Sequence, residues 1–409
     1  WKNKAFPNNI FLNRLFPDKL VLLKRIDGHA LLVNDLVIKK AGISSKTKVK
    51  GGSILVENNK PTGVLVDNAM DLAMGILPPN TSKDITKALI DAEKKALENG
   101  LTTVDDAGLE KKTIQVIDSL QQIGELKIRV YAMISNTKDN LNYYLTNGII
   151  EKEKLTVRSV KAYLDGALGS RGALLKNPYS DENKNKGLTI TTKEELFDLA
   201  NKLSSKGFQL NTHAIGDKAN EIVLDVYNYI LKDIEDPRWR VEHAQVVDEF
   251  DIQKFNSKII PSVQPTHATS DMKWADERLG SKRLNRAYAY KELLDWSGKI
   301  ALGTDFPVEK VNPLLTFYSA VARKDVDGNP SDGFLKENAL TRQEALKGMT
   351  IWAAYSNFED SFKGSIEKGK FADFVILTKD IMKVPEQEIT SAEVVATVVN
   401  GSIVFQKFD

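Results

Sequence analysis

The sequence predicts an α/β protein in which a parallel β-sheet is covered by helices. Short apolar segments alternate with longer segments of helical spacing through most of the 409 residues. The hydrophobic fraction of 42% supports a sizeable core, and the charged fraction of 27% is ordinary, which argues against disorder. Because repeated strand–helix units bury both faces of a sheet, this alternation favours parallel strands with crossover helices.

The first unit of this pattern has clear end signals. Thr81 or Ser82 can cap a helix whose apolar side chains recur every three or four residues. The dipeptide Asn99-Gly100 ends that helix, because glycine tolerates the left-handed backbone of a helix terminus. Residues 101–104 then have the composition of a short buried strand.

The unit repeats several times along the chain. Thr192 and Glu195 form a capping box for a second helix, which Gly207 ends. The predicted parallel strands occupy residues 101–104, 127–134, 157–164, 208–212, 239–242, 258–263 and 299–302, and further helices occupy 218–231, 248–255 and 290–296. Seven such strands are one short of a closed eight-stranded barrel, and a doubly wound open sheet is the alternative. Residues 20–25 are a further plausible strand.

Two segments depart from the strand–helix alternation. Residues 51–68 alternate in polarity around Asn58-Asn59, which predicts a β-hairpin inserted in the barrel. After residue 361 the chain turns to strands at 372–377 and 394–406, with a hairpin turn at Asn400-Gly401. We therefore predict a barrel domain over residues 1–360, with the insertion near 51–68, and part of a small β subdomain over 361–409.

Composition excludes several classes of function. The net charge of +2 leaves no strongly basic face for nucleic acid, and the absence of cysteine excludes disulfides and thiolate metal sites. No apolar run is long enough for a membrane helix. Because the chain begins at Trp1 and no targeting segment is visible, a cytoplasmic and an exported location both stay open.

Polar side chains with metal-ligating chemistry follow the predicted strands. The chain has four histidines, and two of them, His213 and His243, end consecutive strands. Asp305 ends the last strand, and Lys161 lies within a predicted buried strand. Taken singly, each could be an ordinary core or surface residue. Together they meet at the strand edge that carries catalysis in parallel barrels, and a buried ammonium at Lys161 needs a partner or a modification.

Two glycine-rich segments are candidates for ligand-binding loops. Residues 364–370 match a phosphate-binding loop, but Phe371 stands where a hydroxyl is required and a strand follows, so we interpret the segment as a turn. The loop 166–172 lacks the dinucleotide-binding spacing. We expect this loop to approach a substrate closely, with Arg171 as a clamp for a carboxylate.

The order of Lys161, His213, His243 and Asp305 on successive strands resembles the amidohydrolase superfamily. More narrowly, the chain resembles the YtcJ-like branch, which includes N-substituted formamide deformylases. The matching stretches are RIDGHA (25–30), PTGVL (61–65), VKAYLDGALGSRG (160–172), NTHAIGD (211–217), RVEHAQ (240–245), GTDFPVE (303–309) and LTRQEA (340–345).

The resemblance implies a (β/α)8 TIM-type barrel with a β-sandwich subdomain and a divalent metal centre, usually zinc and often binuclear. It implies that Lys161 is N-carboxylated and bridges two metals. His213 and His243 would bind one metal. Asp305 would bind the other and act as the general acid and base.

The sequence departs from the family at the first barrel strand. The family carries a His-x-His pair there, whereas the nearest histidines here, His243 and His267, are 24 residues apart. We therefore expect an N-terminally truncated chain whose first barrel strand is missing. Such a chain would hold at most a partial site built from Lys161, His213 and His243.

The implied activity is hydrolysis of an amide-type, non-peptide C–N bond of a small molecule by metal-activated hydroxide. A non-catalytic or regulatory small-molecule-binding member of the fold is the alternative, and a deaminase acting on a cyclic amidine is a third reading. The substrate and the oligomeric state, including a homodimer, stay open. Six residues are predicted to contact substrate: His29, His267, Asp165, Arg171, Arg278 and Tyr290.

Overall fold

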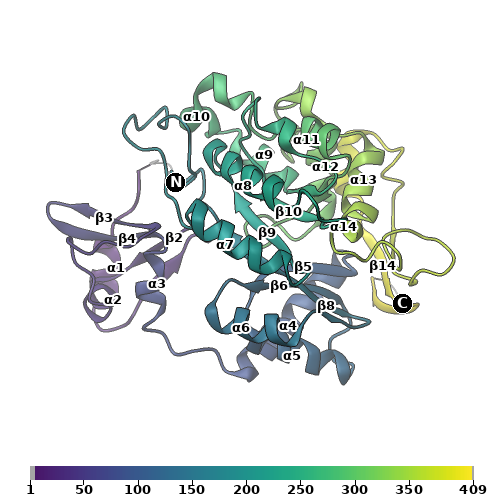
Figure 1. The fold of residues 1–409 in the computed structure, drawn as a ribbon, viewed down its shortest axis with the longest axis horizontal. Coiled ribbons are helices and arrows are strands. Elements are labelled where there is room, and N and C mark those ends of the chain that lie inside the picture. The colour runs from purple at the N-terminus through teal and green to yellow at the C-terminus, as the bar shows by residue number, and fades with distance from the viewer. Residues whose placement is uncertain (1–4, 408–409) are drawn as a thin grey trace.

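The computed structural model describes residues 5–407 and is organised around a curved parallel sheet with helices outside it (Figure 1). Seven parallel strands follow the spatial order β12-β11-β10-β9-β8-β6-β5, and the short β7 (Ile150–Glu151) pairs antiparallel with β8. The parallel strands are β5 (Thr103–Leu109), β6 (Arg129–Ser135), β8 (Leu155–Tyr163), β9 (Gln209–Ala214), β10 (Trp239–His243), β11 (Ile259–Val263) and β12 (Ala301–Leu302). The predicted α/β barrel class is confirmed, in the form of a curled sheet whose described edges are β5 and β12.

The helices that cover this sheet bury apolar stripes of the kind that their spacing predicts. In α7, Leu196, Leu199 and Leu203 are buried against the strands. Both predicted caps are present, because Thr81 and Thr192 each accept a hydrogen bond from the third residue of their helix. The covering helices are α4 (Ser82–Glu98), α5 (Lys111–Gln122), α6 (Lys138–Asn147), α7 (Lys193–Ser204), α8 (Asp217–Ile230), α11 (Tyr290–Ser297), α12 (Pro313–Ala322), α13 (Arg342–Met349) and α14 (Ile351–Ser356).

Two more helices, α9 (Pro265–Asp271) and α10 (Ala275–Leu284), follow β11. No helix within residues 5–407 combines the length and the apolar character needed to cross a membrane. The predicted helix over 248–255 is wrong, since only a 3₁₀ turn, η1 (Ile252–Lys254), forms there. The Asp248 carboxylate accepts a hydrogen bond from the Phe250 amide, and this local turn competes with helix formation. Two further 3₁₀ turns are η2 (Lys336–Asn338) and η3 (Glu386–Ser391).

A separate antiparallel sheet with the order β1-β2-β4-β3 lies beside the barrel, at the left of Figure 1. Residues 20–25 contribute β1 to this sheet and not to the parallel one. The hairpin expected around residues 58 and 59 is present, and both asparagines have a left-handed backbone, with φ of 48° and 61°. Its elements are β1 (Leu22–Lys24), β2 (Ala30–Val33), β3 (Gly52–Glu57) and β4 (Lys60–Asp67), with α1 (Ile10–Leu15), α2 (Asp35–Lys40) and α3 (Met70–Met74).

The C-terminal strands form a third sheet, β13 (Phe374–Leu377), β14 (Val394–Val399) and β15 (Ser402–Gln406). The turn at Asn400 and Gly401 has φ of 50° and 76°, as the hairpin signal predicts. The Thr397 hydroxyl donates a 2.7 Å hydrogen bond to the Leu97 carbonyl and so joins this sheet to the end of α4. The division of the chain into domains at residue 360 stays a prediction.

Candidate metal centre

Lys161, His213 and His243 lie at one edge of the parallel sheet, near the carboxyl ends of β8, β9 and β10. The strand register pairs Tyr163 with His213, and His243 with Ala214, so the side chains of neighbouring strands reach similar heights. The carboxyl edge of a parallel barrel is where catalytic groups gather. The strands therefore deliver the predicted residues to the edge at which chemistry is expected.

All four histidines form one continuous row of rings. The ring centroids of His29 and His213 are 5.2 Å apart, those of His213 and His243 are 4.6 Å apart, and those of His243 and His267 are 5.9 Å apart. His29 enters this row from the antiparallel sheet, in the turn between β1 and β2. His267 enters from the first turn of α9. Four segments far apart in the sequence thus converge on one small volume.

One end of the row has the geometry of a metal site. His243, His267 and Asp305 each offer a ligand atom, and these atoms lie within 4.8 Å of one another. His267 Nε2 is buried without a hydrogen-bond partner in the described part of the chain, and it lies 3.6 Å from Asp305 Oδ2. His243 and Asp305 both have a left-handed backbone, with φ of 74° and 54°. Such outliers concentrate at functional sites, where the surrounding structure holds them in place.

Two histidines of this row, His213 and His243, are prepared to ligate as neutral rings. Burial lowers the pKa of His213 and His243 well below the ordinary value, and the neighbouring histidine and lysine charges add to this effect. His243 Nδ1 lies 2.7 Å from Gln264 Oε1, so it donates its proton there and leaves the Nε2 lone pair for a ligand. A metal-binding histidine is commonly oriented by an acceptor of this kind.

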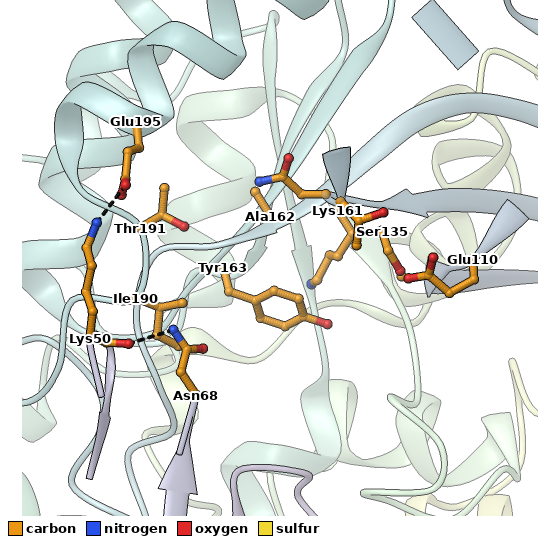
Figure 2. A pocket seen from close by; sticks show the side chains of 13 residues that line it. Lys50, Asn68, Glu110, Ser135, Lys161, Ala162, Tyr163, Ile190, Thr191 and Glu195 are labelled. Atoms are coloured by element: carbon orange, nitrogen blue, oxygen red, sulfur yellow. Dashed lines mark hydrogen bonds and ion pairs between the residues drawn. The ribbon is translucent and has the colours of Figure 1, made fainter. Parts of the chain in front are cut away.

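Lys161 is only 4% exposed, and its ammonium makes no hydrogen bond or ion pair in the structure of residues 5–407. Burial lowers its pKa, although the charges of Glu242 and Asp305 oppose this shift. Figure 2 shows Lys161 and Tyr163 at the inner wall of a cavity of about 680 Å³, with the Lys50–Glu195 ion pair on the other side. The Lys161 Nζ atom is 5.0 Å from the centroid of the Tyr163 ring. The Lys161 amine is therefore a buried group at the wall of a cavity.

Asp165 has a structural position at the edge of the site. Its carboxylate accepts hydrogen bonds from the amides of Leu174, Ile215 and Gly216 at 2.8–3.0 Å. His213 Nε2 lies 3.5 Å from the Asp165 carboxylate. Burial raises the Asp165 pKa to about 7, and the three amides oppose that rise. Asp165 thus fixes the loop after β8 against the turn after β9.

The remaining predicted contacts lie further from the histidines. Arg171 and Arg278 both pair with Asp181, so their charges are already compensated. The Tyr290 hydroxyl donates a 3.0 Å hydrogen bond to the backbone carbonyl of Gln264. The side chain of the same Gln264 contacts His243. The sequence prediction missed Gln264, although its place directly after β11 was a signal that it reaches the same edge.

The sequence model of the amidohydrolase family matches residues 1–405. The chain belongs to the amidohydrolase family. The chain is 33% identical to the putative amidohydrolase YtcJ of Bacillus subtilis, over 97% of this chain and 76% of that protein. It is 33% identical to the Protein LONG AFTER FAR-RED 3 of Arabidopsis thaliana, over 98% of this chain and 72% of that protein.

A third relative of the amidohydrolase, the N-substituted formamide deformylase of Arthrobacter pascens, is 24% identical over 98% of this chain and 76% of that protein. Among solved structures, an uncharacterized metal-dependent hydrolase from Pyrococcus horikoshii superposes with a TM-score of 0.76. It shares 28% identity over 93% of this chain and 76% of that chain. The chain is therefore a hydrolase of the amidohydrolase superfamily and belongs to its YtcJ-like branch.

Proposed function

We propose that this chain forms the catalytic barrel of a metal-dependent hydrolase that cleaves an amide-type C–N bond. The observation that carries this proposal is the convergence of His243, His267 and Asp305, whose ligand atoms lie within 4.8 Å of one another. Two imidazoles and one carboxylate are a donor set that zinc accepts. The buried, unpartnered His267 Nε2 supports this fit, because an orphaned polar atom at such a place is costly without a ligand.

His243, His267 and Asp305 would hold one divalent metal, and His213 and Lys161 stand beside them as ligands for a second. The set differs from the one that the family resemblance implies, since His267 takes a ligand position in place of a substrate contact. Lys161 fits carboxylation because its amine is buried and unpaired. Its neutral Nζ would attack carbon dioxide, form an N–C bond and lose a proton, which leaves an anionic carbamate.

A bound divalent metal would supply Lewis acidity and lower the pKa of water to about 7. Asp305 is placed to accept the proton of the attacking water and to pass it to the leaving amine nitrogen as the C–N bond breaks. Burial raises the Asp305 pKa, which makes its carboxylate a better proton acceptor. Burial lowers the pKa of His243, which favours the uncharged ring that a metal ligand requires.

The test uses zinc-loaded enzyme and formanilide, a small secondary formamide, with chromatographic measurement of aniline. Formamides are chosen because one relative is named as an N-substituted formamide deformylase. We expect turnover in the wild type and its loss in His267→Asn, together with about one zinc fewer per chain. Asp18→Asn, an exposed change in the turn before β1, is the control. Zinc binding with no hydrolysis across a panel of formamides, other amides and cyclic amidines would contradict the proposal.

A second measurement addresses Lys161 without an activity assay. Protein equilibrated with ¹³C-bicarbonate should show a carbamate carbon signal in its ¹³C spectrum. Lys161→Met should remove that signal, while Lys50→Met should keep it. A wild-type spectrum without the signal at saturating zinc and bicarbonate would contradict carboxylation of Lys161.

The alternative function is ligand binding without catalysis. One observation favours it, namely that the described residues contain a single group of three candidate metal ligands. In that case formanilide analogues would bind to the zinc-loaded protein with a measurable heat and release no aniline. The same assay therefore separates the two functions.

A further inference from the structure

Asp67 is a buried carboxylate at the end of β4 whose interaction with His29 has no role in the function proposed above. Its side chain is fully buried, and Oδ1 lies 2.6 Å from His29 Nδ1. Oδ2 is buried and has no hydrogen-bond partner within residues 5–407. Because burial of an unpaired carboxylate is costly, the imidazole N–H is the group that keeps this one in place. His29 Nδ1 therefore carries the proton.

The backbone around Asp67 is shaped to accommodate its carboxylate. Asp67 has a left-handed backbone with φ of 49°, and its amide donates a 3.1 Å hydrogen bond to the His29 carbonyl. A Cβ atom at Gly166 would lie 2.3 Å from Asp67 Oδ2, and one at Gly172 would lie 2.7 Å from the same atom. The glycine-rich loop thus approaches Asp67 closely, where the sequence predicted an approach to substrate. Three backbone positions are adapted to one side chain that contacts no solvent.

The opposite side of His29 faces the metal centre. Its ring lies 5.2 Å from that of His213, its side chain is 17% exposed, and Nε2 makes no hydrogen bond among the described residues. With the proton on Nδ1 facing Asp67, Nε2 is the ring nitrogen left to present a lone pair. His29 stands at the far end of the histidine row from Asp305 and His267. It accordingly lies beside His213, at the opposite end of the row from His267.

We propose that Asp67 fixes the tautomer of His29 and that His29 Nε2 accepts the N–H of a secondary amide substrate. This inference rests on the proposed function, because it assumes that the carbonyl of the amide lies over His243, His267 and Asp305. Under this proposal, the nitrogen of a small formamide is directed along the row of rings toward His29. The enzyme would select N-monosubstituted amides over N,N-disubstituted ones. Asp67 is the positioning residue in this arrangement, and His29 is the residue that contacts substrate.

A matched pair of substrates tests the selection. Zinc-loaded wild type should hydrolyse formanilide with a kcat/KM at least 100-fold above that for N-methylformanilide, because the methylated compound has no N–H to donate and leaves His29 Nε2 unpaired. Asp67→Asn should reduce this ratio below tenfold, since the side-chain amide of the variant would donate to Nδ1 and move the proton to Nε2. His29→Phe should reduce the ratio equally. The double variant should be no worse than His29→Phe alone, and Asp18→Asn should keep the wild-type ratio.

A second measurement reads the tautomer directly. The chain has four histidines, so ¹⁵N-histidine labelling gives a resolvable spectrum, with His29→Phe providing the assignment. We expect an Nδ1–H tautomer at His29 in wild type, with and without zinc, and an Nε2–H tautomer in Asp67→Asn. The same spectrum shows whether each variant is folded.

The outcomes separate this inference from the proposed function. Equal hydrolysis of the two formamides would overturn the selection and leave the hydrolase assignment standing. Hydrolysis of neither by zinc-loaded enzyme would remove formamides from the proposed function and the substrate role of His29 with them. In that case an Nδ1–H tautomer would still support the Asp67–His29 pairing, and an Nε2–H tautomer in wild type would overturn it.

Discussion

At the scale of single residues, the candidate site contains side chains in backbone conformations or buried environments that their residue types seldom adopt. Asp305 and His243 have the left-handed backbone that non-glycine residues seldom adopt, and His267 keeps an unpaired nitrogen in a buried position. Each of these features costs stability unless a ligand or the surrounding packing compensates for it. Their convergence on one point is the reason to place chemistry there.

Asp305→Asn should separate metal binding from proton transfer. The amide oxygen of the variant can still ligate, but it cannot accept a proton at neutral pH, so zinc content should stay near the wild-type value. The kcat on formanilide should fall by roughly 10²- to 10⁴-fold, the usual contribution of a general base. Elemental analysis and steady-state kinetics on the same preparation check both halves. An unchanged kcat would remove Asp305 from the proton transfer.

Asp271, at the end of α9, should make stability depend on pH. Burial raises its pKa to about 6, and its carboxylate accepts hydrogen bonds from Tyr288 and Gln245. Because the folded-state pKa is raised, the contribution of Asp271 to the free energy of unfolding is complete below the unfolded-state pKa of about 4. It is lost as the pH rises through 6. Asp271→Asn cannot ionise, so its advantage over wild type should grow by about 1 to 3 kcal/mol between pH 4 and 7. Urea unfolding in the presence of a chelator measures this, and a difference independent of pH would contradict it.

At the scale of elements, local signals in the sequence identified helices and strands better than their ends or partners. The cap expected at Thr81 or Ser82 and the capping box at Thr192 predicted α4 and α7, because a cap is a contact within four residues. The helix expected over 248–255 failed because an aspartate turn competed with it. Residues 20–25 have strand composition, but composition does not reveal which sheet a strand joins. Pairing partners depend on tertiary docking, which a local pattern does not encode.

The turn between β9 and α8 depends on the small size of Gly216. A Cβ atom there would lie 1.9 Å from the Leu174 carbonyl oxygen, in a loop that Asp165 already ties to the Gly216 amide. Gly216→Ala should therefore destabilise the protein by roughly 2 kcal/mol or more through overpacking. Gly303→Ala is the matched control, since nothing lies within 4 Å of its added carbon and its φ is not positive. Equal denaturation midpoints for the two variants would contradict this account.

At the scale of the whole molecule, the sequence predicted which strand-end residues meet at one edge of the sheet. It did not predict the contacts made by residues of other segments. His213, His243 and Asp305 could be assigned to one edge because parallel strands align their carboxyl ends. The place of His267 beside them could not, since it depends on how α9 packs after β11. The Asp67–His29 contact joins residues 38 positions apart in another sheet. Such contacts depend on how segments far apart in the sequence pack against one another in the folded chain.

Metal binding should stabilise the folded chain as a unit. The candidate ligands come from β10, α9 and the segment after β12, so a metal bound to them would link elements that unfolding separates. At zinc concentrations about 100-fold above the dissociation constant, the gain should be about 2.7 kcal/mol. We expect the Tm to rise by several degrees with zinc and not with magnesium, and the rise to vanish in His243→Asn. A zinc-induced rise that persists in this variant would place the metal elsewhere.

The cradle around the Asp67 carboxylate also has an evolutionary consequence. A lineage that replaces Asp67 with a smaller or neutral side chain removes the reason for glycine at positions 166 and 172, because the atom that excludes a Cβ there is Asp67 Oδ2. Conversely, any side chain gained at Gly166 or Gly172 would expel the carboxylate and release His29. These four positions should therefore change together among descendants of this fold, as a single inherited unit spread over two sheets.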